Sequence, residues 1–338
     1  MIPQPTPKTL PDQRALTLSL LALVVALFIA SLVVGPAGIP PGRGLLALFT
    51  GQGGAEVLVM REIRLPRAIL GLAIGASLGL AGAAMQGFLR NPLAEPGLIG
   101  TSAAAALGAV LAIHTGIYAS FALALPLMAL AGAGLSVGVI LLLAGPRGNA
   151  LSLILAGIAV SSLAGALTSL VLNLAPNPYA ASEIVFWMMG SLADRSLLHV
   201  ALALPFLALG AALIATTGRG LDALTLGEDA AASLGIKLTR LRLKLVLGTA
   251  ALVGASVAVA GAVGFVGLIA PHLMRRAVGA RPSRLLPASA LTGAAILLAA
   301  DIATRVIAPE RDLKLGVLTA LVGAPFFLHL VRRMAREV

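Results

Sequence analysis

The chain has 338 residues, of which 59% are hydrophobic and only 11% are charged, and its mean hydropathy is +1.02. Soluble globular domains carry roughly 25% charged residues, so this composition excludes a soluble enzyme and predicts an all-α polytopic membrane protein. The sequence contains no cysteine, which excludes disulfides, thiolate metal sites and iron–sulfur clusters.

Uncharged blocks follow one another along the chain, and about 20 apolar residues suffice for one membrane span. The first block, 15–34, exceeds the apolar core of a signal peptide and lacks a convincing cleavage site, so we interpret it as a retained span. The other blocks are 68–89, 96–146 (two spans broken near 114–120), 148–182, 196–218, 245–274 (one span and a short glycine-hinged return), 285–300 and 315–331. Together they predict about ten transmembrane helices per protomer.

The distribution of positive charge predicts the orientation of these spans. If both termini are cytoplasmic, sixteen of the 24 Lys and Arg lie on the cytoplasmic side and eight lie outside. Cytoplasmic loops normally carry the excess of Lys and Arg, which favours this arrangement. The net charge of +11 is then a topology signal, and we expect no nucleic-acid partner.

One short sequence occurs twice. GASLGLAGA (75–83) and GASVAVAGA (254–262) share six of nine residues, and the predicted topology makes the two spans run in opposite directions. This pattern indicates an inverted internal repeat, with a first half at about 61–173 and a second at about 240–332 of a single transmembrane domain, 1–338. The alternative is a small-residue packing motif that has arisen twice.

Several blocks are distinctive enough to compare with known families: RLPR (64–67), GAAMQGFLRNPLAEPGLIG (82–100), LILAGIAV (153–160), LGEDAAASLGI (226–236), GAVGFVGLIAPHLMRR (261–276), AADIATRVI (299–307) and LKLGVLTALVGAPFF (313–327). In this order they closely resemble the FecCD-type family, the permease subunits of ABC importers for iron–siderophore complexes, haem and cobalamin. The resemblance covers most of the chain from residue 61 onwards. Its AMQG…NPLAEPG and GFxGLIxPHxxR blocks are highly specific.

The resemblance implies a docking role for arginines on the outer face. In that family, arginines at the RLPR and DIxxR positions pair with glutamates of a substrate-binding protein. By that match the candidates are Arg64, Arg67 and Arg305, with Arg61 as a weaker one. The guanidinium fork suits carboxylates, although ordinary interfacial anchoring is the alternative. Asp301 is expected to pair with Arg305 at the outer end of its span.

The longest cytoplasmic loop, about 218–243, contains a short amphipathic segment. Leu224, Leu226, Ala230, Ala231 and Leu234 form an apolar stripe, the acids suit the helix start, and Gly235 suits its end. The resemblance makes this segment the element that couples to the ATPase subunit, with these candidate residues: Leu226, Gly227, Glu228, Asp229, Ala231, Leu234 and Gly235. The alternative is an interfacial helix lying on lipid.

The resemblance also implies a cytoplasmic gate. The turn at 91–96 contains two prolines, and by the match this turn and the loop at 147–152 close the pathway. The gate candidates are Asn91, Leu93, Ala150 and Leu151. A plain connection between helices is the alternative, and Ala150 departs from the small hydroxylated residue expected there.

The energy source must lie outside this chain. No GxxxxGK[ST] phosphate loop occurs, so this chain cannot cradle ATP phosphates itself and we expect ATP to be used by a partner subunit. The alternative of a membrane-embedded enzyme would need clustered His, Asp or Glu at the bilayer interface, and none appears in the sequence. We therefore expect no enzyme activity and no cofactor bound by this chain. The uncharged blocks hold no Asp, Glu, Lys or Arg, which disfavours the alternative of an ion-gradient-driven secondary transporter with inverted repeats. The four histidines show no ligand spacing, so no metal site is expected.

The resemblance thus implies a homodimeric permease in the lipid bilayer of a bacterial inner membrane, with both termini cytoplasmic. Its partners would be two cytoplasmic ATP-binding subunits and a periplasmic substrate-binding protein. It would move a metal chelate from periplasm to cytoplasm by alternating access. We rank ferric siderophore first, haem second and cobalamin third as substrate. The site that holds the chelate should contain no strong ligand for bare metal ions.

Overall fold

The computed structural model describes residues 12–121, 123–145, 150–308 and 311–334, and all regular structure in these ranges is helical. Eight helices are long and apolar enough to span a membrane, one of them counted from Ala55 to Phe88. Their bounds are α1 (Gln13–Val33), α4 (Leu65–Phe88), α7 (Ala124–Ala144), α8 (Ala150–Asn173), α10 (Leu197–Ala215), α13 (Leu238–Ala260), α15 (Pro282–Ile307) and α16 (Leu315–Met334).

Two shorter helices, α5 (Thr101–His114) and α14 (Val266–Arg275), complete the predicted set of about ten. At 1.5 Å per residue they extend about 21 Å and 15 Å, less than the roughly 30 Å of a bilayer core. Each follows a break in the helical backbone, at 89–100 and at 261–265. The first break contains the 3₁₀ turn η2 (Pro96–Ile99). The short return after α13 is therefore confirmed.

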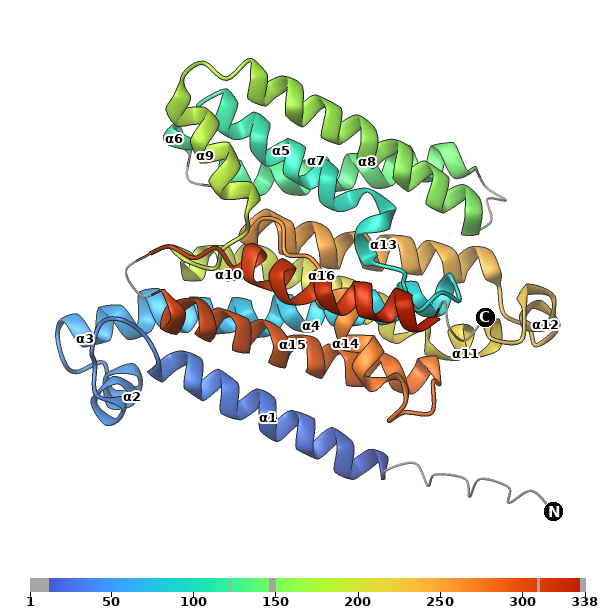
Figure 1. Cartoon of the computed structure of the whole chain (residues 1–338), viewed down its shortest axis with the longest axis horizontal. Coiled ribbons are helices and arrows are strands. Elements are labelled where there is room, and N and C mark those ends of the chain that lie inside the picture. Colours follow the sequence, from blue (N-terminus) through green and yellow to red (C-terminus); the bar gives the residue numbers. More distant parts are fainter. Residues whose placement is uncertain (1–11, 122, 146–149, 309–310, 335–338) are drawn as a thin grey trace.

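The remaining elements cap the two ends of the bundle (Figure 1). We call one end the α2 end, because it carries α2 (Pro41–Thr50) and α3 (Ala55–Leu58), and the opposite end the α12 end, after α12 (Glu228–Ser233). The other capping elements are η1 (Val59–Arg64, a π-helical turn), α6 (Ile117–Ser120), α9 (Pro178–Met188) and α11 (Gly218–Leu224). The start of α1 and the end of α16 both lie at the α12 end.

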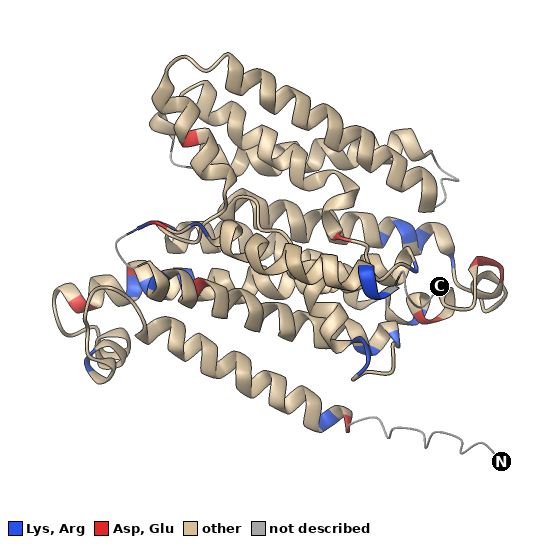
Figure 2. Ribbon diagram, in the orientation of Figure 1, with Lys and Arg blue, Asp and Glu red and all other residues tan. Residues whose placement is uncertain are grey.

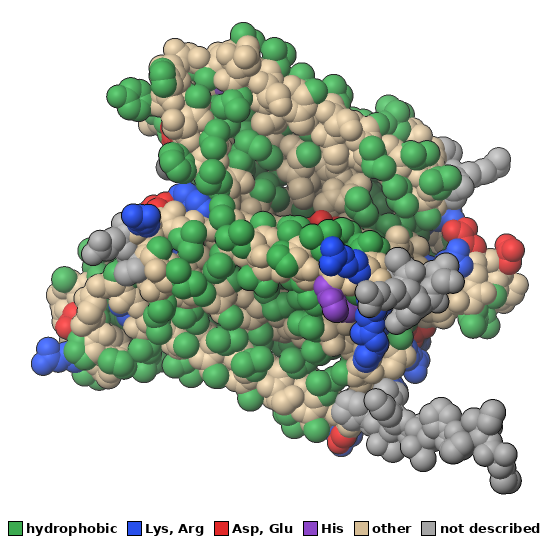
Figure 3. All heavy atoms as spheres, viewed as in Figure 1, with side chains coloured by type: hydrophobic (Ala, Val, Ile, Leu, Met, Phe, Trp, Pro, Cys, Tyr) green, Lys and Arg blue, Asp and Glu red, His purple; other side chains and the backbone are tan. Residues whose placement is uncertain are grey.

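The two copies of the repeated sequence lie on α4 and α13, which run in opposite directions (Figure 1). These helices also form the centre of the bundle. We compare the buried share of the most apolar 18-residue stretch of each helix. It is 78% in α4 and in α13, against 17% in α1. Peripheral helices expose many hydrophobic side chains on the surface in view (Figure 3). The core is therefore built from the repeat helices, and the outer helices present apolar surface.

Glycine permits the close contact between α4 and α15. A Cβ on Gly79 would lie 2.1 Å from the backbone oxygen of Ser289, and a Cβ on Gly75 would lie 2.5 Å from that of Gly293. Both positions exclude any larger residue unless the backbones separate. Helices in lipid associate through such van der Waals contact because there is little hydrophobic drive between them.

The uncharged block at 148–182 supplies one span, as predicted, and a second, shorter helix follows that span. The span α8 ends at Asn173, and α9 begins at Pro178 after Asn177, whose side chain accepts a hydrogen bond from Ala180 N at 2.9 Å. An asparagine cap followed by proline at the first helical position starts a new helix. The span is correspondingly shorter than the uncharged block.

Candidate transport path and docking surfaces

Charged side chains gather at the two ends of the bundle (Figure 2). In the described residues, the α12 end holds the larger basic group: Arg14, Arg90, Arg219, Lys237, Arg240, Arg242, Lys244, Arg275, Arg276, Arg281, Arg284, Arg332 and Arg333. The α2 end holds fewer bases: Arg43, Arg61, Arg64, Arg67, Arg195, Arg305, Arg311 and Lys314. The fold thus separates the two groups that the sequence assigns to opposite sides.

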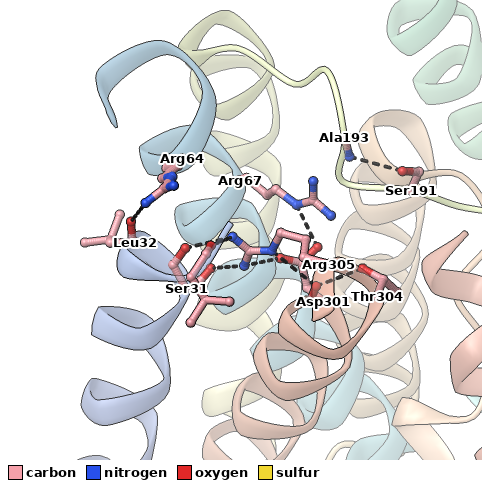
Figure 4. A network of polar contacts seen from close by, with 10 residues as sticks. Ser31, Leu32, Arg64, Arg67, Ser191, Ala193, Asp301, Thr304 and Arg305 are labelled. Carbon is pink, nitrogen blue, oxygen red and sulfur yellow. Dashed lines mark hydrogen bonds and ion pairs between the residues drawn. The ribbon is translucent and has the colours of Figure 1, made fainter. Parts of the chain in front are cut away.

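Two of the predicted docking arginines bind the last turn of α1 (Figure 4). Arg64 is 4% exposed, and its Nη1 donates to the carbonyl oxygens of Leu32 at 3.0 Å and Val33 at 2.7 Å. Arg305 Nη1 donates to the carbonyl oxygens of Ser31 and Val34, both at 2.8 Å. The last carbonyls of a helix have no partner within it and attract cations, so both arginines fasten α1 to the bundle.

Asp301 of α15 connects this helix to α4, which carries Arg67. Its Oδ1 accepts from Arg67 Nε at 2.8 Å and its Oδ2 accepts from Arg305 Nη2 at 2.7 Å. The Asp301 side chain is 1% exposed, whereas Arg67 retains 18%. The pairing with Arg305 that the sequence predicts is confirmed, and Arg67 is a second partner from α4.

An open cavity of about 300 Å³ lies beside this cluster at the α2 end. Its basic lining residues are Arg67, Arg305 and Arg311, and Asp312 is its acidic one. Arg61 does not line it and instead donates to the carbonyl oxygen of Leu48 at the end of α2, at 2.9 and 3.0 Å. Arg311 is exposed and was not among the sequence candidates, because it belongs to none of the recognised motifs.

The predicted coupling segment folds as α11 and α12. Helix α12 begins at Glu228 and ends at Ser233, and Gly235 adopts a positive φ of 83° just beyond it. The predicted apolar stripe is divided between two environments. Leu226 and Leu234 are 69% and 64% exposed. Leu224 and Ala231 are buried in the core of the bundle, because the segment packs back against it. Gly227 also has a positive φ, 107°, and Asp229 lies in the first turn.

Polar contacts fasten this segment to two long helices. Asp222 accepts from Ser283 N, Ser283 Oγ and Arg281 Nε at 2.7–2.8 Å, and so caps α15. Burial would raise the pKa of Asp222, but these hydrogen bonds and the Arg281 charge outweigh it and hold the pKa below its usual value. Glu228 pairs with Arg242 of α13 at 2.7 Å. The segment is therefore bonded to α15 through α11 and to α13 through α12.

The predicted gate residues lie on two elements. Asn91 Oδ1 accepts from Leu93 N at 2.9 Å, a local turn that follows α4. Ala150 and Leu151 form the first turn of α8 and not a loop, while residues 147–149 lie outside the described ranges. The flanking segments meet in a small apolar cavity of about 10 Å³, lined by Met85, Phe88, Leu89, Leu98, Ile99, Leu153, Ile154, Leu245 and Val246.

A cavity of about 430 Å³ lies where the two backbone breaks meet α8 and α13. Figure 3 shows the molecule hollowed between the lobe that contains α8 and the remaining helices. Small and apolar residues dominate the lining, including Val253, Val257, Gly261, Ala262 and Gly264. Non-helical backbone at membrane depth is tolerated only when it is buried or lines a cavity.

The polar part of this lining was not predicted. It consists of one carboxylate and four hydroxyls: Glu95, Ser102, Ser161, Ser162 and Ser256. Glu95 is part of the NPLAEPG block but was treated only as a turn residue, because its distance from the membrane surface depends on how far the break extends into the bundle. Within the described residues, no three His, Cys, Asp or Glu side chains are grouped to hold a metal ion.

Comparison with known proteins agrees with this arrangement. The model of the FecCD transport family matches residues 23–333. The chain is 41% identical to the cobalamin import system permease protein BtuC of Halobacterium salinarum, over 82% of this chain and 74% of BtuC. It is 38% identical to the Fe(3+) dicitrate transport system permease protein FecD of Escherichia coli, over 87% and 91% of the two chains.

A solved structure of a metal-chelate type ABC transporter in an inward-facing conformation shares the fold. The TM-score is 0.84 at 32% identity, and the match covers 95% of this chain and 99% of the other. The family match extends over nearly all the described helices, including both repeat copies and the coupling segment. The chain belongs to the FecCD transport family and is the membrane permease subunit of an ABC importer.

Proposed function

We propose that this permease moves a ferric siderophore or a related chelate, haem or cobalamin, from periplasm to cytoplasm. The observation that supports this proposal is the cavity at the two backbone breaks. Its lining is mostly apolar with a few polar side chains, and it lies between the oppositely directed repeat helices. It offers hydroxyls and one carboxylate but no cluster of metal ligands in the described residues, which suits a chelated metal. The helices of residues 61–173 form one half of the permease and those of residues 240–332 form the other, and the two halves move relative to each other around this cavity.

The test is transport by the reconstituted complex. Vesicles containing this permease, its ATPase and its binding protein should accumulate chelate only when ATP is supplied, because this chain has no phosphate loop. A binding panel on the cognate binding protein, with iron chelates, haem and cobalamin, identifies the substrate. Equal uptake without nucleotide would contradict the proposal and restore the ion-gradient alternative.

We place the α12 end in the cytoplasm of a bacterial inner membrane, with both termini there. Support comes from the larger basic group at that end. Two ATP-binding subunits then contact α11 and α12, and the binding protein contacts the α2 end. We propose a homodimer in which a second copy covers the open side of the cavity, since outward residues of α8 and α16 such as Leu163 and Leu321 are 62% and 65% exposed.

Leu234→Asp should uncouple ATP hydrolysis from uptake. The exposed Leu226 and Leu234 give α12 an apolar contact surface for the ATPase, and a carboxylate placed in such a contact is left desolvated and unpaired. We expect uptake to fall at least tenfold while the permease remains in the membrane. Leu234→Met is the matched control, because it keeps an apolar side chain of similar volume at the same exposed position. Full uptake in Leu234→Asp would refute the coupling role.

Arg311→Glu should weaken binding-protein docking. Arg67 and Arg311 line the α2-end cavity, so they are the better placed docking residues, whereas docking by Arg61, Arg64 or Arg305 would require breaking their bonds to helix ends. The charge of Arg311 can be reversed without breaking the hydrogen bonds that hold the end of α1, because Arg64 and Arg305 make those bonds. We expect a several-fold slower association that is most evident at low salt. Arg43→Glu, an exposed change at the same end outside the cavity, should leave association unchanged; equal effects of both would argue against docking here.

A further inference from the structure

A single side chain joins the two backbone breaks of the repeat. Glu95, from the break after α4, lines the path cavity, and its Oε1 accepts a hydrogen bond from Phe265 N at 3.1 Å. Phe265 is the residue that immediately precedes α14 after the second break. A carboxylate at this position also faces the positive end of the α14 dipole. Glu95 thus holds the start of a helix that lies 170 residues away in the chain.

Phe265 is held in a conformation that needs such support. Its φ is +68°, a region that costs a bulky L-residue free energy and persists only when its surroundings impose it. Its ring lies against α16, where a Cβ on Gly323 would be 2.2 Å from Phe265 Cγ. The backbone of Phe265 is therefore fixed by Glu95 on one side and its ring by Gly323 on the other.

A second contact fastens the far part of α14 to α4. Gln86, which is 1% exposed, accepts from Arg275 Nη2 at 2.5 Å and donates to the carbonyl oxygen of Leu268 at 3.4 Å. One residue before Leu268 the backbones also touch, since a Cβ on Gly82 would lie 1.9 Å from the Gly267 oxygen. Helix α14 is therefore secured to α4 from its first turn onwards without Glu95. Glu95 instead bonds the residue before α14, at the end of the 261–265 break that lines the cavity.

We propose that Glu95 is a positioning residue of the transport path, which keeps the 261–265 wall of the cavity in place by accepting a hydrogen bond from Phe265 N. This role rests on the proposed function of the cavity as the path. The hydrogen-bond acceptor is what matters, and the negative charge is secondary. The contact joins the first half of the repeat to the second at the point where the path must change shape.

The acceptor and the charge can be separated by substitution. Glu95→Gln keeps an oxygen that can accept from Phe265 N and removes the charge, whereas Glu95→Ala removes both. We expect ATP-driven uptake to fall about tenfold in Glu95→Ala, the upper end of what one hydrogen bond contributes, and to stay within about threefold of the parent in Glu95→Gln. Equal losses in both variants would overturn the proposal, since charge and not position would then decide uptake.

A second measurement does not depend on transport. The chain has no cysteine, so Val266→Cys, at a residue 1% exposed beside Phe265, introduces a single buried thiol at the start of α14. A thiol reagent should label it several-fold faster when Glu95→Ala is added, and at the parent rate when Glu95→Gln is added. Unchanged labelling in Glu95→Ala refutes the positioning role. Absence of ATP-driven uptake in the parent would instead refute the proposed function and leave the labelling result to stand.

Discussion

Asp301→Asn should be among the most destabilising single substitutions in this protein. The Asp301 carboxylate is 1% exposed and pairs with Arg67 and Arg305 at 2.8 and 2.7 Å. Removing its charge leaves two guanidinium groups without their counter-ion, and breaking one side of a buried pair costs about 3–5 kcal/mol. We expect a correspondingly large loss of unfolding free energy in detergent, and faster proteolysis at residues 34–40, because Arg305 also holds the end of α1.

Asp312→Asn is the control for this substitution. Asp312 also pairs with a base, Lys314, at the same end of the bundle, but its side chain is 61% exposed. Exposed pairs contribute little, so stability should remain within about 0.5 kcal/mol of the parent. If the two variants have equal free energies of unfolding, the ion pairs of Asp301 with Arg67 and Arg305 do not stabilise the bundle.

Gly82→Ala should disrupt the contact between α4 and α14. The added Cβ would lie 1.9 Å from the backbone oxygen of Gly267 and 2.7 Å from its Cα. Backbone cannot rotate away as a side chain does, so the two helices must separate. Overpacking of this kind costs typically about 1–3 kcal/mol, and more where backbones collide. We expect a large fall in membrane-inserted protein and in the melting temperature of what remains.

Gly134→Ala tests whether this effect comes from the contact and not from the substitution itself. Gly134 lies inside α7, and a Cβ there meets no atom within 4 Å. Alanine favours a helix over glycine by about 0.5–1 kcal/mol, so this variant should be as stable as the parent or slightly more so. Equal destabilisation of the two variants would exclude the backbone contact as the cause.

Local sequence predicted the helices well where one physical rule dominated. Length and hydropathy predict a span whatever its neighbours are, so α1, α4 and α10 begin and end within a few residues of their uncharged blocks. The same rule predicts one span in 148–182 but not where that span ends, because Asn177 and Pro178 begin a new helix within apolar sequence. The motif blocks likewise predicted the family, which the comparisons confirm.

The sequence alone therefore determined the class of protein, the set of spans and the family, because these depend on composition and on local pattern. Tertiary structure decided which motif residues are buried and what they touch. It places Arg64 and Arg305 on the end of α1, turns Ala231 inward, and brings Glu95 to Phe265. Such contacts join residues far apart in the chain, and they arise only when helices pack closely enough for their backbones and buried polar groups to meet.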